Sequence, residues 1–164
     1  MKLGDFMKKI MIVLIALIAI GVSISAVSAE GFSFSFGSES NSDGGDISID
    51  NNKLKMQGVE FKIPEGFKEN ESARMLANDT NAFGEDCKES ATTFYNNDTN
   101  IIVKIFFAKD GKFENVTGEN PLTLAGHDGF ITEKDGRAIF DYNADGKIVE
   151  IDAPDQDTIK SILG

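Results

Sequence analysis

Acidic and amide side chains stand at alternate positions near the end of the chain, in the stretch DYNADGKIVEID from Asp141 to Asp152. Calcium takes six to eight oxygen ligands, which proteins supply as closely spaced carboxylates and carbonyls. Gly146 permits a sharp turn, so the side chains of Asp141, Asn143 and Asp145 can converge on one ion. This spacing makes the three residues candidate ligands of a weak calcium site.

The same stretch resembles the calcium loop of EF-hand and dockerin modules. The resemblance implies two further ligands, the backbone carbonyl of Lys147 and the carboxylate of Asp152. Two features depart from that pattern. Val149 occupies the ninth place, where an oxygen donor is usual. An EF-hand loop also follows a helix, whereas the residues from 137 to 142 alternate like a strand.

A β-hairpin is the alternative interpretation of this stretch. Lys147 to Asp152 alternates with the period of a strand, and Asn143 to Gly146 would form a four-residue turn. At ~3.3 Å per residue, Asp152 would then lie ~17 Å from the turn and could not close the site. Three possibilities stay open: a hairpin without functional metal, a hairpin with a weak calcium site at its turn, and a helix-loop-helix site.

Cys87 and His127 are the single cysteine and the single histidine, and in principle they form a nucleophile and a base, as in a hydrolase. The neighbours of Cys87 oppose this chemistry, because Glu85, Asp86 and Glu89 disfavour a thiolate. The sequence therefore favours a buried Cys87, a surface turn position for His127, and a domain without catalytic residues or a required cofactor. One cysteine forms no internal disulfide, so the fold depends on its apolar core.

The first 29 residues have the layout of a secretory signal peptide. Lys8 and Lys9 precede an apolar run from Ile10 to Ile20, and Val27-Ser28-Ala29 offers small residues to a signal peptidase. The alternative is an uncleaved anchor, because about 20 mostly apolar residues are enough to cross a bilayer. In either case we expect the rest of the chain to be secreted or extracytoplasmic, with the membrane as a partner if the segment is retained.

The chain is acidic, with a formal net charge of −11. Residues 1–29 carry three lysines and one aspartate, a net of +2, so the rest of the chain carries −13. A polyanion of this size is repelled by nucleic acid and by anionic lipid. We therefore expect no nucleic-acid partner, and a surface suited to solubility, to cations or to basic proteins.

Four Asn-x-Ser/Thr sequons follow the signal segment, and none has proline in the middle. In an exported chain, such asparagines are candidate glycosylation acceptors on surface loops. Each sequon lies in a polar, loop-like stretch of the sequence. The candidate acceptors are Asn70, Asn78, Asn97 and Asn115.

Residues 30–52 are expected to be a linker, because they are rich in Ser, Gly and Asp and have no helical period. Phe32, Phe34 and Phe36 alternate with serines in this segment, which is the period of a strand. Residues 53–164 are expected to be one globular domain. The polar region from 68 to 89 shows only short helical pieces around 72–77.

The fold class that we predict is α+β: a single antiparallel β-sheet domain of about seven short strands with a short C-terminal helix. Ile159, Ile162 and Leu163 give that helix one apolar face, and Gly164 ends it. A near-continuous apolar run at 101–107 predicts a central strand covered on both faces. The other strands are expected at 59–63, 90–95, 122–125, 130–133, 138–142 and 147–151.

The segments GVEFKIPEGF, GHDGFI, IFDY and DGKIVEI together resemble small exported β-rich domains of uncharacterised function from methanogenic archaea. The resemblance covers most of residues 53–163 and rests on turn and strand motifs. It implies one α+β domain and supplies no catalytic residues. We therefore expect an exported protein- or surface-interaction module, with a calcium-binding module and a Cys87/His127 hydrolase as the alternatives.

Overall fold

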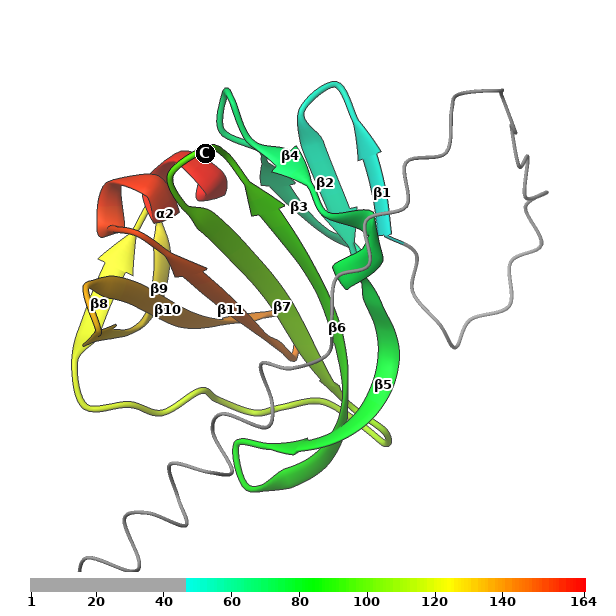
Figure 1. Cartoon of the computed structure of the whole chain (residues 1–164). Helices are drawn as coiled ribbons and strands as arrows, with labels where there is room; N and C mark the ends of the chain where they lie inside the picture. Colours follow the sequence, from blue (N-terminus) through cyan, green and yellow to red (C-terminus); the bar gives the residue numbers. More distant parts are fainter. Residues whose placement is uncertain (1–46) are drawn as a thin grey trace, which may run out of the picture. The chain divides into compact units, whose positions relative to one another are not determined.

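The computed structural model describes residues 47–164. The expected signal or anchor segment (1–29) and residues 30–46 of the expected linker lie outside the described residues. The described part is mostly antiparallel β-sheet with one short C-terminal helix, as the sequence predicts (Figure 1). Within residues 47–164, no helix combines the length and the hydropathy needed to cross a membrane.

The strands of this part form two sheets, where the sequence predicts a single sheet of about seven strands. The first sheet is a three-stranded meander whose turns, Asn51-Asn52 and Gln57-Gly58, have the positive φ angles that tight hairpins require. Its first strand lies inside residues 30–52, which were expected to form a linker. That prediction was wrong here because an alternation of only four residues is hard to recognise next to a Gly- and Asp-rich stretch. The three strands are β1 (Ile47–Asp50), β2 (Lys53–Met56) and β3 (Val59–Lys62).

The second sheet has eight strands in the order β4-β6-β7-β11-β10-β9-β8, and β5 also pairs with β6. The last four strands form a meander, and the final one returns to pair with β7 at the centre of the sheet. The strands are β4 (Lys68–Glu69), β5 (Met75–Ala82), β6 (Glu85–Tyr95), β7 (Asn100–Ala108), β8 (Pro121–Leu124), β9 (His127–Lys134), β10 (Arg137–Ala144) and β11 (Lys147–Ala153).

The expectation of a polar region with short helical pieces at 68–89 was largely wrong. A 3-10 turn at Glu71–Ala73 is present, but β4, β5 and the start of β6 occupy most of the region. The sequence of β5, MLANDTNA, is half polar, and none of its residues is buried. Ala77, with φ of 51°, interrupts its register with β6, so no strand period is visible in the sequence.

The main core lies between the two sheets and the C-terminal helix, α2 (Gln156–Leu163). Ile159 and Ile162 of α2 are buried in it, and the Asp155 carboxylate caps the helix by accepting a hydrogen bond from the Thr158 amide at 2.7 Å. The large sheet contributes the inner faces of its central strands, which carry Phe94, Ile101, Val103, Ile105, Phe140, Tyr142, Val149 and Ile151.

The opposite face of the large sheet carries a smaller apolar cluster. Cys87, Phe106 and Ile148 from the sheet pack with Phe113 and Val116 from the loop that joins β7 to β8, residues 109–120. The Phe113 amide donates to the Gly146 carbonyl at 2.9 Å, which ties the loop to the sheet. Strand β7 is thus covered on both faces, as the apolar run predicts.

Candidate functional site

The stretch from 141 to 152 is a β-hairpin, formed by β10 and β11. Its turn consists of Asp145 and Gly146, whose φ angles of 54° and 79° are those of a tight two-residue turn. The hairpin interpretation is therefore confirmed, but the expected four-residue turn was wrong. Asn143 and Ala144 belong to β10 and pair with Ile148 and Lys147, so the strands continue closer to the turn than the sequence suggests.

The hairpin separates the candidate calcium ligands. Asp145 is exposed in the turn, whereas Asp152 lies opposite Ile139 at the far end and binds the Arg137 guanidinium at 2.6 Å. The Asn143 side chain accepts from the Gly146 amide at 3.0 Å and donates to the Phe113 carbonyl at 3.2 Å. Among residues 47–164, no three His, Cys, Asp or Glu side chains are grouped so that they could hold a metal ion.

Asp141 is the most unusual residue of the hairpin. Its Oδ1 atom is buried without a hydrogen-bond partner. Asp141 pairs across the strands with Glu150, and the Lys104 ammonium is 2.7 Å from the Glu150 carboxylate rather than bonded to Asp141. Burial raises the pKa of Asp141 to about 7, repulsion by Glu150 adds to the rise, and Lys104 opposes it. Asp141 can therefore take up or release a proton near neutral pH.

Asp141, Glu150 and Lys104 lie side by side on three neighbouring strands, and we call them the charged row. This row was not predicted from the sequence. Asp141, Glu150 and Lys104 are more than forty residues apart at the extremes, and only the register of three strands aligns them. Given a two-residue turn at 145–146, the opposition of Asp141 and Glu150 follows by counting outward from the turn. With the expected four-residue turn at 143–146, the same counting places Asp141 opposite Ile148 and not opposite Glu150.

Cys87 and His127 are not brought together. Strands β6 and β9, which carry them, are separated by β7, β11 and β10, which at ~4.8 Å per strand is roughly 19 Å. Cys87 packs in the smaller cluster, whereas the His127 ring lies 4.6 Å from the ring of Tyr142 on the other face of the sheet. Burial raises the pKa of the Cys87 thiol, which disfavours a thiolate nucleophile. His127 begins β9, so its expected position in a surface turn was wrong.

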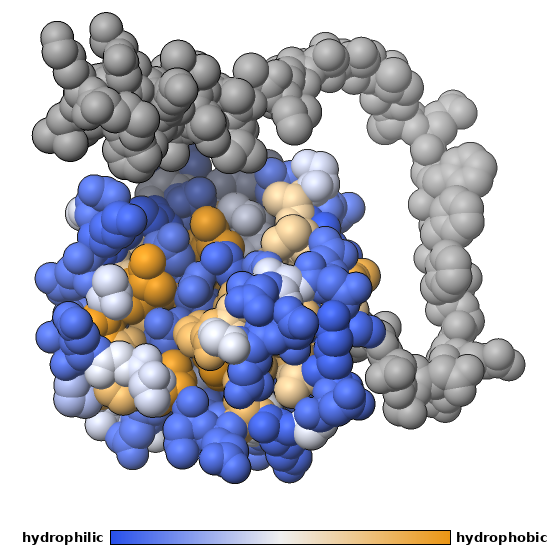
Figure 2. All heavy atoms as spheres, turned by 90° about the horizontal axis from the view of Figure 1, so that it is seen from below, coloured by the Kyte–Doolittle hydropathy of each residue, from blue (hydrophilic) through white to orange (hydrophobic). Residues whose placement is uncertain are grey.

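The β5–β6 hairpin carries the large apolar side chains that are exposed in the described part of the chain. Leu76 lies on β5, Phe83 at the tip and Tyr95 at the end of β6, and they are 51%, 41% and 47% exposed. Figure 2 shows the molecule from below, with apolar residues emerging in separate patches between hydrophilic ones. Tyr95 pairs with Lys68 of β4, beyond the part of β6 that pairs with β5, so the three side chains do not form one patch. A single exposed apolar residue is ordinary unless its position has another unusual feature.

Phe83 stands out among the three. Its φ of 55° lies in the left-handed region, which is unfavourable by roughly 1 kcal/mol for a bulky side chain. The ring contacts Phe106 and Phe113 edge to face, at centroid distances of 5.2 and 6.4 Å, yet much of it stays exposed. Glu85 and Asp86, which begin β6 directly after the tip, are exposed acids. The tip therefore presents an aromatic side chain beside negative charge.

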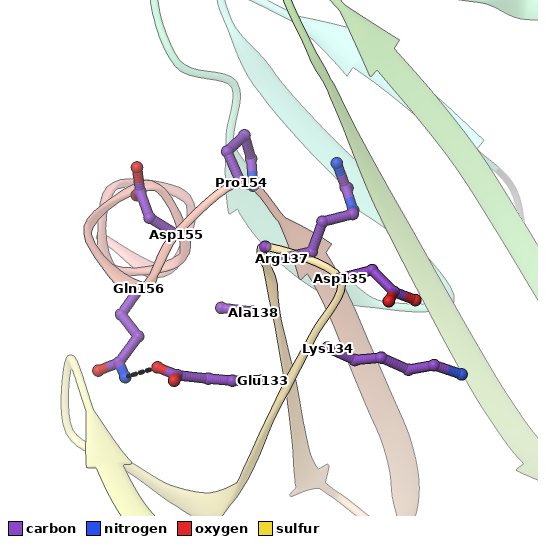
Figure 3. A pocket seen from close by; sticks show the side chains of 9 residues that line it. Glu133, Lys134, Asp135, Arg137, Ala138, Pro154, Asp155 and Gln156 are labelled. Atoms are coloured by element: carbon purple, nitrogen blue, oxygen red, sulfur yellow. Dashed lines mark hydrogen bonds between the residues drawn. The ribbon is translucent and has the colours of Figure 1, made fainter.

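A hollow of about 380 Å³ opens between the β9–β10 turn and the start of α2 (Figure 3). Gln156 donates to Glu133 at 3.0 Å on one side of it. Arg137 turns away from these two residues and binds the Asp152 carboxylate and the Asn100 carbonyl. Lys134, Asp135 and Asp155 leave charges of both signs on the lining, so the hollow favours no single class of ligand.

Comparisons with known proteins add no functional assignment. No protein-family model matches the chain, and neither a curated protein nor a solved structure matches it. The geometry of the described residues and the sequence pattern are therefore the basis for the function proposed below.

Proposed function

We propose that this chain is an exported, extracytoplasmic interaction module that acts by contacts and not by catalysis. Its N-terminal segment would direct export and either be removed or hold the chain at the membrane. The sequence pattern of residues 1–29 and the likeness to exported β-rich domains support the export. The exposed aromatic ring of Phe83 at the tip of the β5–β6 hairpin supports the contact, and this single observation carries the proposal.

The contact is centred on Phe83. An aromatic side chain on a rigid hairpin offers a large contact area at little cost in conformational entropy. The backbone at this position is strained, and a Gly or Asn would fit the turn better. A phenylalanine at this strained position is explained if the exposed ring takes part in a contact. The acidic neighbours Glu85 and Asp86 select a partner with an apolar pocket rimmed by Lys or Arg.

The proposal is tested by binding of the labelled chain without residues 1–29 to the outer surface of the producing cells, so that an N-terminal anchor does not itself retain the chain. Phe83→Ser should abolish binding, and reversing the exposed charges with Glu85→Lys and Asp86→Lys should weaken it. The second variant matters because Phe83 also packs on Phe106, so its loss could affect folding. Glu133→Lys, an exposed charge reversal on β9, is the matched control. Equal binding of all variants would refute the proposal.

A calcium-dependent module is the second candidate, and one observation favours it. The buried Asp141 Oδ1 accepts no hydrogen bond from the described residues, so this oxygen is available to bind a cation. Asp141, Asn143 and Asp145 would hold the ion weakly, with water completing the coordination. The test is thermal unfolding in millimolar calcium and in EDTA, for the natural chain and for Asp145→Ala. A calcium-dependent rise in Tm that the variant lacks would support this candidate. A Tm that ignores calcium would exclude it.

A further inference from the structure

Strand β5 forms an open edge of the large sheet. It pairs with β6 on one side, and within residues 47–164 no strand pairs with its other side. An unpaired edge is a template on which another chain can add a strand, and proteins protect such edges. At eight residues, β5 is long enough to pair, and Leu76 adds an apolar side chain that is 51% exposed. This edge therefore needs protection.

The protection visible in the structure is partial. The register shift at Ala77 bends the first part of the strand, and the ion pair between Asp79 and Lys109, at 3.0 Å, places charges near its middle. Both residues of that pair are largely exposed, so the pair is a weak barrier. Beyond Ala77, regular pairing with β6 runs from Asn78 to Ala82, which leaves a regular outer edge over the same residues.

We propose that Asn78 is N-glycosylated and that its glycan shields the open edge of β5. The inference rests on the proposed export, because glycosylation of this kind occurs on exported chains. Asn78 is exposed in the strand and belongs to the sequon Asn78-Asp79-Thr80. A glycan is bulky compared with the ~4.8 Å spacing of paired strands, so it obstructs the approach of a second strand.

The modification requires a transferase and an activated glycosyl phosphate donor, for example one linked to a membrane lipid. The Asn78 amide nitrogen forms a bond to the anomeric carbon of the sugar. The bond between that carbon and the donor's phosphate oxygen breaks, and the phosphate leaves with the electron pair. The amide nitrogen gives up one proton to a base. No residue of this chain is needed as a catalyst.

The other three sequons lie where a glycan has a different effect. Asn97 is exposed in the β6–β7 turn, and Asn115 is exposed on the loop over the smaller cluster. Asn70 is half-buried, and its side chain accepts a hydrogen bond from the Ser72 hydroxyl of its own sequon. Asn78 is the acceptor on the strand with the open edge, and the tip at Phe83 lies beyond it. The glycan therefore blocks strand addition while the tip stays accessible.

The test uses the full chain, exported from a host that glycosylates sequons, with glycopeptide mass spectrometry and light scattering. We expect a glycan mass on the peptide that contains Asn78 and a monomeric chain. Thr80→Val removes the sequon but keeps Asn78, and Asn78→Gln removes the acceptor. Both should lose that glycan and show at least a doubling of the weight-average mass at the same concentration. Thr80→Ser keeps the sequon and should behave as the natural chain does.

The possible outcomes separate this inference from the proposed function. An exported chain that carries no glycan at Asn78 overturns the inference and leaves the interaction module standing. An Asn78→Gln chain that remains monomeric overturns the shielding role. A chain that stays in the cytoplasm without glycan overturns both. Asn97→Gln, which removes a glycan away from the edge, should leave the mass distribution monomeric, and association of that variant would also count against the shielding role.

Discussion

The charge of Asp141 should make the stability of this protein depend on pH. Burial and Glu150 raise the pKa of this carboxyl from its ordinary 3.8 to about 7 in the folded chain. A raised pKa means that the folded state binds the proton more tightly than the unfolded state. The favourable contribution of this residue is therefore complete below pH ~4 and is lost as the pH rises through about 7.

The magnitude follows from the same values. A rise from 3.8 to about 7 would correspond to ~4 kcal/mol at most, at ~1.4 kcal/mol for each tenfold change in proton affinity. Asp141 is only half-buried, and water reaching the side chain reduces this figure, so we expect ~1–2 kcal/mol. Asp141→Asn removes the charge and keeps the shape. It should gain this amount relative to the natural chain as the pH rises from ~4 to ~8, and more than half of the gain should fall between pH 5 and pH 8.

The assay is urea unfolding of both chains at pH 5 and pH 8, with EDTA present. At each pH, the unfolding free energy of the natural chain is subtracted from that of the variant. The prediction concerns how this difference changes between pH 5 and pH 8. Asp110→Asn, on the exposed part of the loop, is the control for the loss of one negative charge. If the difference for Asp141→Asn does not grow in favour of the variant as the pH rises, the account of this buried carboxyl is wrong.

Three further predictions concern packing. Gly129→Ala should destabilise the fold by about 3 kcal/mol in urea unfolding, because the added Cβ would clash with the Asp141 carbonyl oxygen and lie 2.8 Å from the Phe140 ring. A change below ~0.5 kcal/mol would contradict this packing. The Cys87 thiol should react with a thiol reagent on the order of 100-fold more slowly in the folded than in the unfolded chain, since it is buried; a fast reaction would instead favour the hydrolase alternative. Asp155→Ala should lower stability by ~1 kcal/mol through loss of the α2 cap, and Asp155→Ser should restore most of it.

The sequence predicts the parts of the fold in which local pattern and burial agree. The last hairpin is an example: Phe140 and Tyr142 on one strand, and Val149 and Ile151 on the other, share the buried face as their alternation indicates. The C-terminal helix is another, because its apolar spacing and its final glycine coincide. Each of these elements buries one face and exposes the other, so its apolar residues recur with the period of a strand or a helix.

Elements that lack a buried face escaped prediction. Strand β5 has no buried residue and its register is interrupted at Ala77, so its sequence resembles that of a loop. Strand β1 has four residues and follows a stretch of linker composition. The Asp141–Glu150–Lys104 row and the exposed Phe83 depend on the exact turns, since one added turn residue moves each side chain to the other face. The candidate site was therefore the least predictable part of the molecule.

The central claim, that the tip of the β5–β6 hairpin contacts a partner, is tested most directly by photo-crosslinking on the producing cells. A photoreactive phenylalanine analogue replaces Phe83 in the full chain, and the same analogue at Tyr95, an exposed aromatic position at the other end of the hairpin, is the matched control. We predict one discrete crosslinked product from position 83, absent from position 95 and reduced by Glu85→Lys with Asp86→Lys. Absence of a product from position 83, or equal products from both positions, would contradict the account.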